Sequence, residues 1–251
     1  MKQSARALLR PLAIGAFRLV DRLRSATHRY ILILSHMRSG SSLLLHLLMT
    51  SPDISGCGER NRIYRDDEDL AIFGIKSNLG QREKYRASYS VDQINHTHFL
   101  PSESLLLRPS VIPIILLREP QGAIGSMVDV FGLSSDFGID DAIDHYRERV
   151  TTLARYAKLF ASQPRPLFLT YDKLVDETQN SLSMLKDYLE LQTELSDQYS
   201  TFSFTGRQGD RSSRIQAGRV LSRRTNHGVE IDPVTLNELQ AIFNECLRVA
   251  Q

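Results

Sequence analysis

The chain has 251 residues, 41% of them hydrophobic, and its 31 Lys and Arg nearly balance 29 Asp and Glu, for a net charge of +2. This is enough for one domain with a sizeable core, and the balanced charge argues against a general nucleic-acid binder that relies on phosphate neutralisation. Cys57 and Cys246 lie far apart and outside any metal-binding spacing. They predict neither a disulfide framework nor a zinc site, and a reducing compartment is the default.

Residues 1–28 are predicted to form a basic amphipathic helix ahead of a single domain at 29–251. The arginines of this segment are Arg6, Arg10, Arg18, Arg22 and Arg24. Its apolar stretches fall short of the roughly 20 residues of a membrane span, and Arg10 with Pro11 interrupts the apolar region of a signal peptide. Two interpretations remain. The helix either packs on its own domain, which we favour, or rests on an anionic membrane surface.

Short apolar runs predict the strands. "YILILS" at 30–35 is a buried strand by this criterion, and further strands are predicted at 71–76 ("AIFGIK"), 111–117 ("VIPIILL") and 166–171 ("PLFLTY"). Helices are predicted at 42–53, 120–131, 140–162, 178–190 and 233–249. The last has Asp232 as its cap and Pro233 in its first turn. Strands that alternate with helices predict an α/β fold of three layers, with a mostly parallel sheet flanked by helices.

The stretch "SHMRSGSSLL" at 35–44 places a polar, glycine-containing loop between a strand and a helix. Unpaired backbone N–H groups and the positive end of the helix would make an anion site there, suited to phosphate or sulfate. The alternative is an ordinary turn in which Ser41 or Ser42 caps the helix. The loop is not a Walker A motif, because Arg38 precedes the glycine and no lysine follows it.

A second polar group follows the strand at 111–117. Arg118 ends this strand, and Ser126 comes eight residues later, inside the next helix. A P-loop NTPase usually carries a magnesium-binding Asp at such a strand end, whereas an arginine can donate two hydrogen bonds to a phosphate. The alternative is that Arg118 pairs with a nearby acid such as Glu119.

These segments together resemble the PAPS-dependent sulfotransferases, which transfer a sulfuryl group from 3′-phosphoadenosine 5′-phosphosulfate (PAPS) and leave 3′-phosphoadenosine 5′-phosphate (PAP). "RSGSSLL" is similar to their 5′-phosphosulfate loop, and "LLREPQGAIGS" to their 3′-phosphate segment. "LFLTYDKLVDE" at 167–177 resembles the family's strand with its Y-[DE]-x-L element. The resemblance covers about residues 30–220 and implies a P-loop-like parallel sheet with helices on both sides.

The resemblance also implies the residues that bind the nucleotide. By this resemblance the 5′-phosphosulfate would be bound by Arg38, Ser39, Gly40, Ser41 and Ser42. The 3′-phosphate would be bound by Arg118 and Ser126. A glycine-rich basic segment at 204–219 resembles the family's closing segment, with the contacting arginine left open. No tryptophan is present, so adenine stacking falls to Phe or Tyr, and Phe202 and Phe204 are candidates.

Two candidate bases follow from the same resemblance. Glu59 lies where enzymes resembling the protein-tyrosine and carbohydrate sulfotransferases carry a glutamate, and we favour it. His98 in "HTHFLPSE" resembles the "K-T-H-L-P" of small-molecule sulfotransferases, although His96 replaces the lysine. The alternatives are a solvated acid or cap for Glu59 and partly buried imidazoles for the histidines.

Lys76, at the end of "FGIK", is a candidate for stabilising charge on the departing PAP, with an edge-strand lysine as the alternative. This chemistry requires no metal.

The expected activity is transfer of the sulfuryl group to a hydroxyl of a polar acceptor, such as a saccharide, glycolipid or hydroxylated metabolite, because residues 60–110 mix charge with tyrosine. Two other functions remain open: a P-loop-related nucleotide kinase or NTPase, and an inert PAP-binding module. We expect a cytoplasmic protein, with peripheral membrane contact if the N-terminal helix binds lipid. The oligomeric state is left open.

Overall fold

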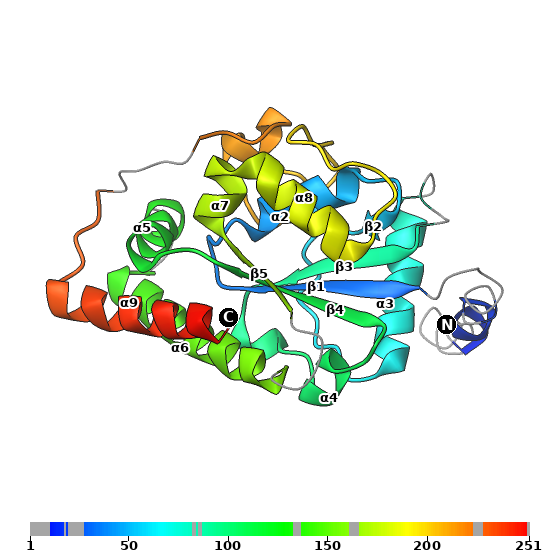
Figure 1. Cartoon of the computed structure of the whole chain (residues 1–251), viewed down its shortest axis with the longest axis horizontal. Helices are drawn as coiled ribbons and strands as arrows, with labels where there is room; N and C mark the ends of the chain where they lie inside the picture. Colours follow the sequence, from blue (N-terminus) through cyan, green and yellow to red (C-terminus); the bar gives the residue numbers. More distant parts are fainter. Residues whose placement is uncertain are drawn as a thin grey trace, which may run out of the picture.

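The computed structural model describes residues 11–17, 19, 28–81, 84, 87–132, 137–160, 166–222 and 228–249. Five strands form its central sheet, in the order β2-β3-β1-β4-β5, and every neighbouring pair is parallel (Figure 1). The strands are β1 (Arg29–Ser35), β2 (Ile54–Gly56), β3 (Tyr89–Ile94), β4 (Val111–Leu117) and β5 (Leu167–Thr170). The predicted α/β class with a parallel sheet is therefore confirmed.

The strand order places a crevice at the carboxyl end of β1. After β1 the chain builds β2 and β3 on one side of it, and later adds β4 and β5 on the other side. Parallel sheets of this kind bind ligands where the strand order reverses, outside the carboxyl ends of the strands. The polar loop after β1 and the arginine after β4 both lie at this position.

Helices cover both faces of the sheet and give the fold three layers (Figure 1). One face packs against α2 (Ser41–Thr50), α7 (Tyr171–Asp176) and α8 (Thr178–Leu189). The other packs against α3 (Asp67–Gly80), α4 (Glu103–Leu106), α5 (Pro120–Phe131), α6 (Ile139–Leu159) and α9 (Pro233–Arg248). Two short 3₁₀ helices, η2 (Thr97–Phe99) and η3 (Ser213–Ala217), complete the described elements. Because both faces are covered, side chains of β1 alternate between two separate apolar cores.

The predicted strand at 71–76 is wrong, because these residues lie inside helix α3. Asp66 caps this helix by accepting hydrogen bonds from the N–H groups of Glu68 and Asp69, both at 2.9 Å. Acidic side chains in the first turn also favour a helix at this point. Lys76 is therefore an exposed residue on a helix and does not end a strand.

Strand β3 was not predicted, because its sequence "YSVDQI" contains as many polar as apolar residues. All six side chains are nevertheless buried. Ser90 Oγ and His28 Nε2 form a hydrogen bond of 2.9 Å. Asp92 accepts a hydrogen bond from the hydroxyl of Tyr64 at 2.6 Å. Such internal pairs let polar side chains occupy a central strand.

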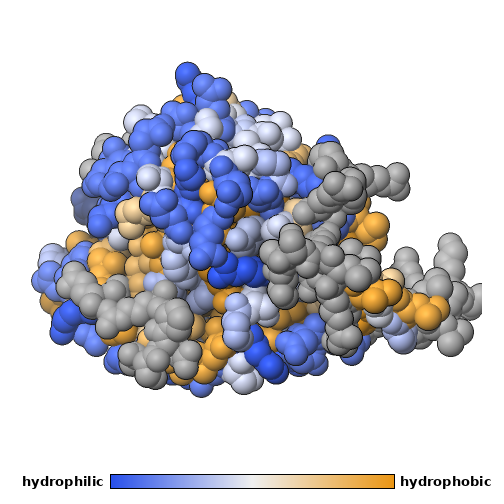
Figure 2. Space-filling view, turned by 45° about the vertical axis from the view of Figure 1, so that its right-hand side comes forward, coloured by the Kyte–Doolittle hydropathy of each residue, from blue (hydrophilic) through white to orange (hydrophobic). Residues whose placement is uncertain are grey.

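The N-terminal helix is described at residues 11–17 and 19, and the rest of the segment lies outside the described residues. Ile14 is buried, and the ring of Phe17 lies against Gly74 of α3 and edge-on to His28. Leu12 and Leu19 are exposed. In Figure 2 hydrophobic residues stand out at the right of the molecule, where this helix lies in Figure 1. Ile14 and Phe17 thus pack against the domain, and the two interpretations of the whole segment stay predictions.

Within the part of the chain that the structure describes, no helix is both long enough and apolar enough to cross a bilayer.

Candidate active site

The loop at residues 36–40 connects β1 to helix α2 and has an unusual backbone. Arg38 and Gly40 both adopt positive φ angles, of 61° and 93°. A Cβ at Gly40 would lie 2.6 Å from the ring of Tyr171, so only glycine fits without a shift. This close approach holds the start of α2 against the end of β5.

The amino end of α2 lacks a capping side chain and has no acidic residue in its first turn. Its N–H groups and positive dipole therefore face the crevice. The Ser39 hydroxyl beside them is fully buried and has no hydrogen-bond partner among the described residues. A buried orphan hydroxyl beside a helix amino end fits an oxyanion ligand such as a phosphate or a sulfate group.

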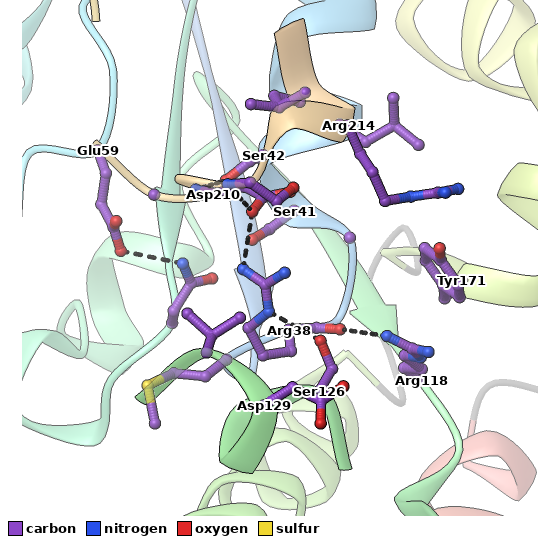
Figure 3. Close-up of a pocket in the computed structure, with 18 of the residues that line it drawn as sticks. Arg38, Ser41, Ser42, Glu59, Arg118, Ser126, Asp129, Tyr171, Asp210 and Arg214 are labelled. Atoms are coloured by element: carbon purple, nitrogen blue, oxygen red, sulfur yellow. Dashed lines mark hydrogen bonds and ion pairs between the residues drawn. The ribbon is translucent and has the colours of Figure 1, made fainter. Parts of the chain in front are cut away.

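Arg38 joins three parts of the site. Its Nε donates to Ser126 Oγ on α5 at 3.0 Å, and its Nη1 donates to Asp210 Oδ1 at 3.0 Å (Figure 3). Arg38 and Ser126 were predicted to bind different phosphate groups of one nucleotide. Their contact shows that the two predicted subsites adjoin each other.

Arg118 lies beside the same loop and is only 7% exposed. Its Nη1 donates to the backbone oxygen of Arg38 at 3.3 Å, and its guanidinium lies over the ring of Tyr171. Glu119, the acid considered as its partner from the sequence, caps α5 by accepting from the N–H of Gly122 at 2.7 Å. Arg118 is therefore directed at the loop and the crevice.

Helix α6 holds both polar segments in place through three residues. His145 Nε2 accepts a hydrogen bond from the Met37 N–H at 3.2 Å, and the Tyr146 hydroxyl donates to the backbone oxygen of Arg118 at 2.8 Å. Arg149 is fully buried and donates to the backbone oxygens of Ser35 and Ile94, at 2.6 and 2.5 Å. The ends of β1, β3 and β4 are thus fixed by one helix.

The buried histidines of this region are neutral. Burial lowers the pKa of His36 to about 3 and that of His145 to about 4. His36 Nε2 accepts a hydrogen bond from the Arg118 N–H at 3.0 Å, which requires an unprotonated nitrogen. Burial also lowers the pKa of His96, and the nearby His98 and Arg149 lower it further.

Glu59 follows strand β2 and faces the crevice from the opposite side to Arg118 (Figure 3). Its Oε1 accepts a hydrogen bond from Asn95 Nδ2 at 2.9 Å. Burial raises the pKa of Glu59, and hydrogen bonds from Asn95 and from the backbone of Gly209 oppose this rise. A carboxylate with a raised pKa is a stronger base at neutral pH, as a general base requires.

The segment at residues 204–219, which we call the lid segment, crosses the crevice above Glu59 and the loop. The N–H of Asp210 donates to Ser42 Oγ at 3.0 Å, and a Cβ at Gly209 would lie 2.5 Å from the same oxygen. Burial would raise the pKa of Asp210, but Arg38 and the groups of Ser212 outweigh it, so that this pKa is lowered. The lid segment therefore places the ionised carboxylate of Asp210 beside the guanidinium of Arg38.

The site contains one cavity of about 180 Å³ (Figure 3), and Ser39, which is fully buried, is not among the residues that line it. The predicted residues that line it are Arg38, Gly40, Ser41, Ser42, Glu59, Arg118 and Ser126. Of the lid segment's arginines, Arg214 and Arg219 line the cavity. Two separate sequence segments predicted to bind oxyanions and one predicted base are thus brought together.

Other predicted residues lie outside the cavity. Lys76 is exposed on α3, and His98 is exposed on η2, whereas its neighbour His96 does line the cavity. Phe202 and Phe204 stack on each other and pack against the core beside His46, so they do not line the cavity. The aromatic side chains that do line it are Phe131, Tyr171 and Tyr199.

Asn95, Asp129 and Tyr171 also line the cavity but were not among the predicted site residues, although Tyr171 begins the Y-[DE]-x-L element. Asn95 and Tyr171 come directly after strands β3 and β5. A position directly after a parallel strand was therefore the sequence signal for these two residues. For Asn95 this signal could not be used, because β3 was not predicted. Asp129 lies within α5, where its spacing of three from Ser126 places both on one helix face.

Comparison with known proteins identifies the fold. No family model and no curated protein matches the sequence. The sulfotransferase domain of the olefin synthase of Synechococcus PCC 7002 matches the structure with a TM-score of 0.51 at 15% identity, covering 89% of this chain and 92% of that domain. The chain therefore has the sulfotransferase fold, which confirms the fold expected from the resemblance of its motifs.

Retinol dehydratase is also similar in structure. Its complex with androsterone and the inactive cofactor PAP matches with a TM-score of 0.46 at 14% identity, covering 87% of this chain and 80% of that one. Its complex with retinol and PAP matches with a TM-score of 0.46 at 12% identity, covering 87% and 81%.

Proposed function

We propose that this protein is a PAPS-dependent sulfotransferase, which transfers the sulfuryl group of PAPS to a hydroxyl of a polar acceptor and releases PAP. The observation that carries the proposal is the meeting of the loop at 36–40, Arg118 with Ser126, and Glu59 around one cavity. Two adjoining oxyanion subsites suit a nucleotide with phosphate-type groups on both its 5′ and 3′ positions. ATP has no 3′-phosphate and would leave the second subsite unused.

The residues present fit such a co-substrate. The loop N–H groups, Arg38 and the orphan hydroxyl of Ser39 would hold the 5′-phosphosulfate. Arg118 and Ser126 would hold the 3′-phosphate, with Arg118 oriented by Tyr171. When bound, PAPS supplies an activated sulfuryl group, and the cationic and N–H donors lower the energy of charge that develops on its oxygens.

Glu59 would act as the general base toward the acceptor hydroxyl. Its ionised form removes the proton while the acceptor oxygen attacks sulfur, and the fixed geometry of the cavity aligns the two. Because burial raises the pKa of Glu59, turnover should rise as pH increases through that pKa and the carboxyl loses its proton. Asn95 and His96 also line the cavity and suit a polar acceptor.

Calorimetric titration with PAP, 5′-AMP, ADP and ATP, without magnesium, tests the nucleotide site. Selective binding of PAP supports the proposal. Binding of ATP only with magnesium would instead indicate a nucleotide kinase or NTPase, and equal binding of all four would rule out a double oxyanion site.

Turnover is tested separately, with PAPS and a panel of saccharides, glycolipids and hydroxylated metabolites. Glu59→Gln should bind PAP as the parent protein does and lose most turnover, by about a hundredfold or more. The matched control is Glu238→Gln, which changes an exposed carboxylate on α9 that pairs with Arg147. PAP binding with no turnover on any acceptor would identify an inert binding module, and full activity of Glu59→Gln would remove Glu59 as the base.

Peripheral membrane contact through the N-terminal helix is a second part of the proposal, supported by the exposed Leu12 and Leu19 and by the arginines of residues 1–28. Co-sedimentation with vesicles of anionic lipid, compared for the parent protein and the Leu12→Ser, Leu19→Ser double variant, tests it. Equal behaviour of the two proteins would refute lipid binding by this face.

A further inference from the structure

A chain of hydrogen bonds leads from the end of β1 to Glu59. The Ser35 hydroxyl donates to Asn95 Oδ1 at 2.6 Å, and Asn95 Nδ2 donates to Glu59 Oε1 at 2.9 Å. Ser35 is fully buried and Asn95 is 7% exposed, so bulk water has little access to these bonds. These two hydrogen bonds join three segments of the protein: Ser35 at the end of β1, Asn95 directly after β3, and Glu59 in the loop that follows β2.

We infer that Asn95 is a positioning residue for Glu59, with Ser35 setting the orientation of its amide. This inference rests on the proposed function, in which Glu59 is the general base. It assigns to Asn95 the task of holding one carboxylate oxygen so that the other is directed at the acceptor. Asn95 itself need not contact the reacting atoms.

The geometry determines which end of the amide faces Glu59. A serine hydroxyl that donates to Oδ1 leaves the NH₂ group of Asn95 on the opposite side, toward the carboxylate. If the amide were reversed, its oxygen would face the carboxylate oxygen and two acceptors would repel each other. The carboxylate of Glu59 therefore excludes the reversed orientation, and the Ser35 hydroxyl stabilises the productive one by donating to Oδ1.

The supporting backbone is held by a buried arginine. Arg149 donates to the backbone oxygens of Ser35 and Ile94, the residues at the ends of β1 and β3. Asn95 follows Ile94 directly, so both members of the hydrogen-bond chain sit on backbone that one guanidinium clamps together. This anchoring makes the position of the amide independent of the lid segment.

Other charged and titratable groups lie near Glu59, and one of them, Asp92, has a pKa that burial raises to about 7. Arg38, His96 and Asp210 line the same cavity, and Asp92 accepts from the N–H of the next residue, Arg60. The pKa values of His96 and Asp210 are both lowered. Near neutral pH His96 is therefore neutral and Asp210 is ionised. Asn95 and the backbone of Gly209 are the hydrogen-bond donors that favour the ionised form of Glu59.

The test measures the titration of Glu59 directly. In protein labelled with ¹³C-glutamate, the Glu59 carboxyl signal is assigned by its loss in Glu59→Gln and followed against pH. Asn95→Ala should raise the midpoint by about one pH unit, because the donor to the ionised carboxylate is gone. Ser35→Ala should shift it in the same direction by less, since the amide remains but its orientation is no longer fixed.

A matched control lies elsewhere on the sheet. Ser55 Oγ donates to Asn78 Oδ1 at 2.9 Å, a serine–asparagine pair of the same kind between β2 and α3. Asn78→Ala should leave the Glu59 midpoint unchanged. Slow hydrolysis of PAPS, with water as the acceptor, gives a second readout: Asn95→Ala should lower its rate about tenfold and move its acid limb to higher pH, while PAP affinity stays the same.

The possible outcomes separate this inference from the proposed function. An unchanged Glu59 midpoint and pH profile in Asn95→Ala, with PAP still bound, would overturn the positioning role and leave the sulfotransferase proposal standing. Loss of PAP binding in Asn95→Ala or Ser35→Ala would show a purely structural role and overturn it as well. Failure of the parent protein to bind PAP would refute the proposed function, whatever the titration shows.

Discussion

The guanidinium carbon of Arg118 lies 4.3 Å from the ring centre of Tyr171. This stack restricts the plane of the arginine at the end of β4, while the Arg118 N–H is held by His36 and its backbone oxygen by Tyr146. A cation so oriented is suited to one planar, two-point contact with an oxyanion.

Arg118→Gln should therefore reduce PAP affinity by about tenfold to a hundredfold, the range expected for loss of a charge-assisted contact. Binding of 5′-AMP, which has no 3′-phosphate, should change little. Calorimetry with the two nucleotides measures the difference, with Arg147→Gln on the exposed side of α6 as the control. Equal losses for PAP and 5′-AMP would contradict a subsite specific for the 3′-phosphate.

Asp210 places a negative charge beside the proposed 5′-phosphosulfate subsite. Its carboxylate lies 3.0 Å from Arg38 Nη1, where it competes with an anionic ligand for the same cation. Asp210→Asn keeps an acceptor for Arg38 but removes the charge, so PAP affinity should increase about fivefold. Weaker PAP binding in this variant would show instead that Asp210 is needed to orient Arg38.

Gly40→Ala tests the tight contact between the loop and Tyr171. The substitution combines a positive φ with a steric clash, and should lower the free energy of unfolding by about 2–4 kcal/mol and weaken PAP binding. Gly228→Ala is the matched control, because Gly228 also has a positive φ, but among the described residues no atom lies within 4 Å of the added Cβ. It should cost only about 1 kcal/mol. Similar unfolding curves for both variants would mean that the Tyr171 contact does not matter.

Asp92 should make stability depend on pH. Burial raises its pKa from 3.8 to about 7, despite hydrogen bonds from Tyr64, Arg60 and Gln93 that favour the ionised form. Between these two values the folded chain holds a proton that the unfolded chain has lost, so this contribution to stability is fully present below about pH 4 and is lost as pH rises to about 7. The slope is at most about 1.4 kcal/mol per pH unit.

Asp92→Asn should remove this slope. Urea unfolding of the parent and variant at pH 5, 6, 7 and 8 measures it, and the variant should gain stability relative to the parent as pH rises. Parallel pH profiles for the two proteins would contradict a raised pKa at Asp92.

Local patterns predicted much of the fold. The apolar runs of β1, β4 and β5 and the cap of α9 at Asp232, which accepts from Val234 and Thr235, were recognised because each is encoded by neighbouring residues. The run at 71–76 was misread because a short apolar stretch suits either a strand or a buried helix face. Its acidic residues at 66–69 were the signal for a helix.

The site was predicted where its residues belong to contiguous motifs and missed where it depends on distant partners. Arg38, Gly40, Ser41 and Ser42 of the loop after β1 line the cavity together with Arg118, and their role in nucleotide binding stays a prediction. Asn95, His145 and Arg149 were not predicted, because a polar residue in a strand end or a helix reveals its role only after the sheet brings its partner near. Lys76 was expected at a strand end because this strand was misread, and it lies on α3 outside the cavity.

The attachment of the loop at 36–40 to helix α6 has a consequence for the time at which the site forms during synthesis. The ribosome completes this loop well before α6, and β3 and β4, which flank β1, are also made later. A nascent chain that ends before α6 lacks His145, the partner of the Met37 N–H, and Arg149, which clamps the ends of β1 and β3. The proposed nucleotide site is therefore completed only after synthesis has passed α6, and a bound nucleotide would select molecules whose central sheet is already assembled.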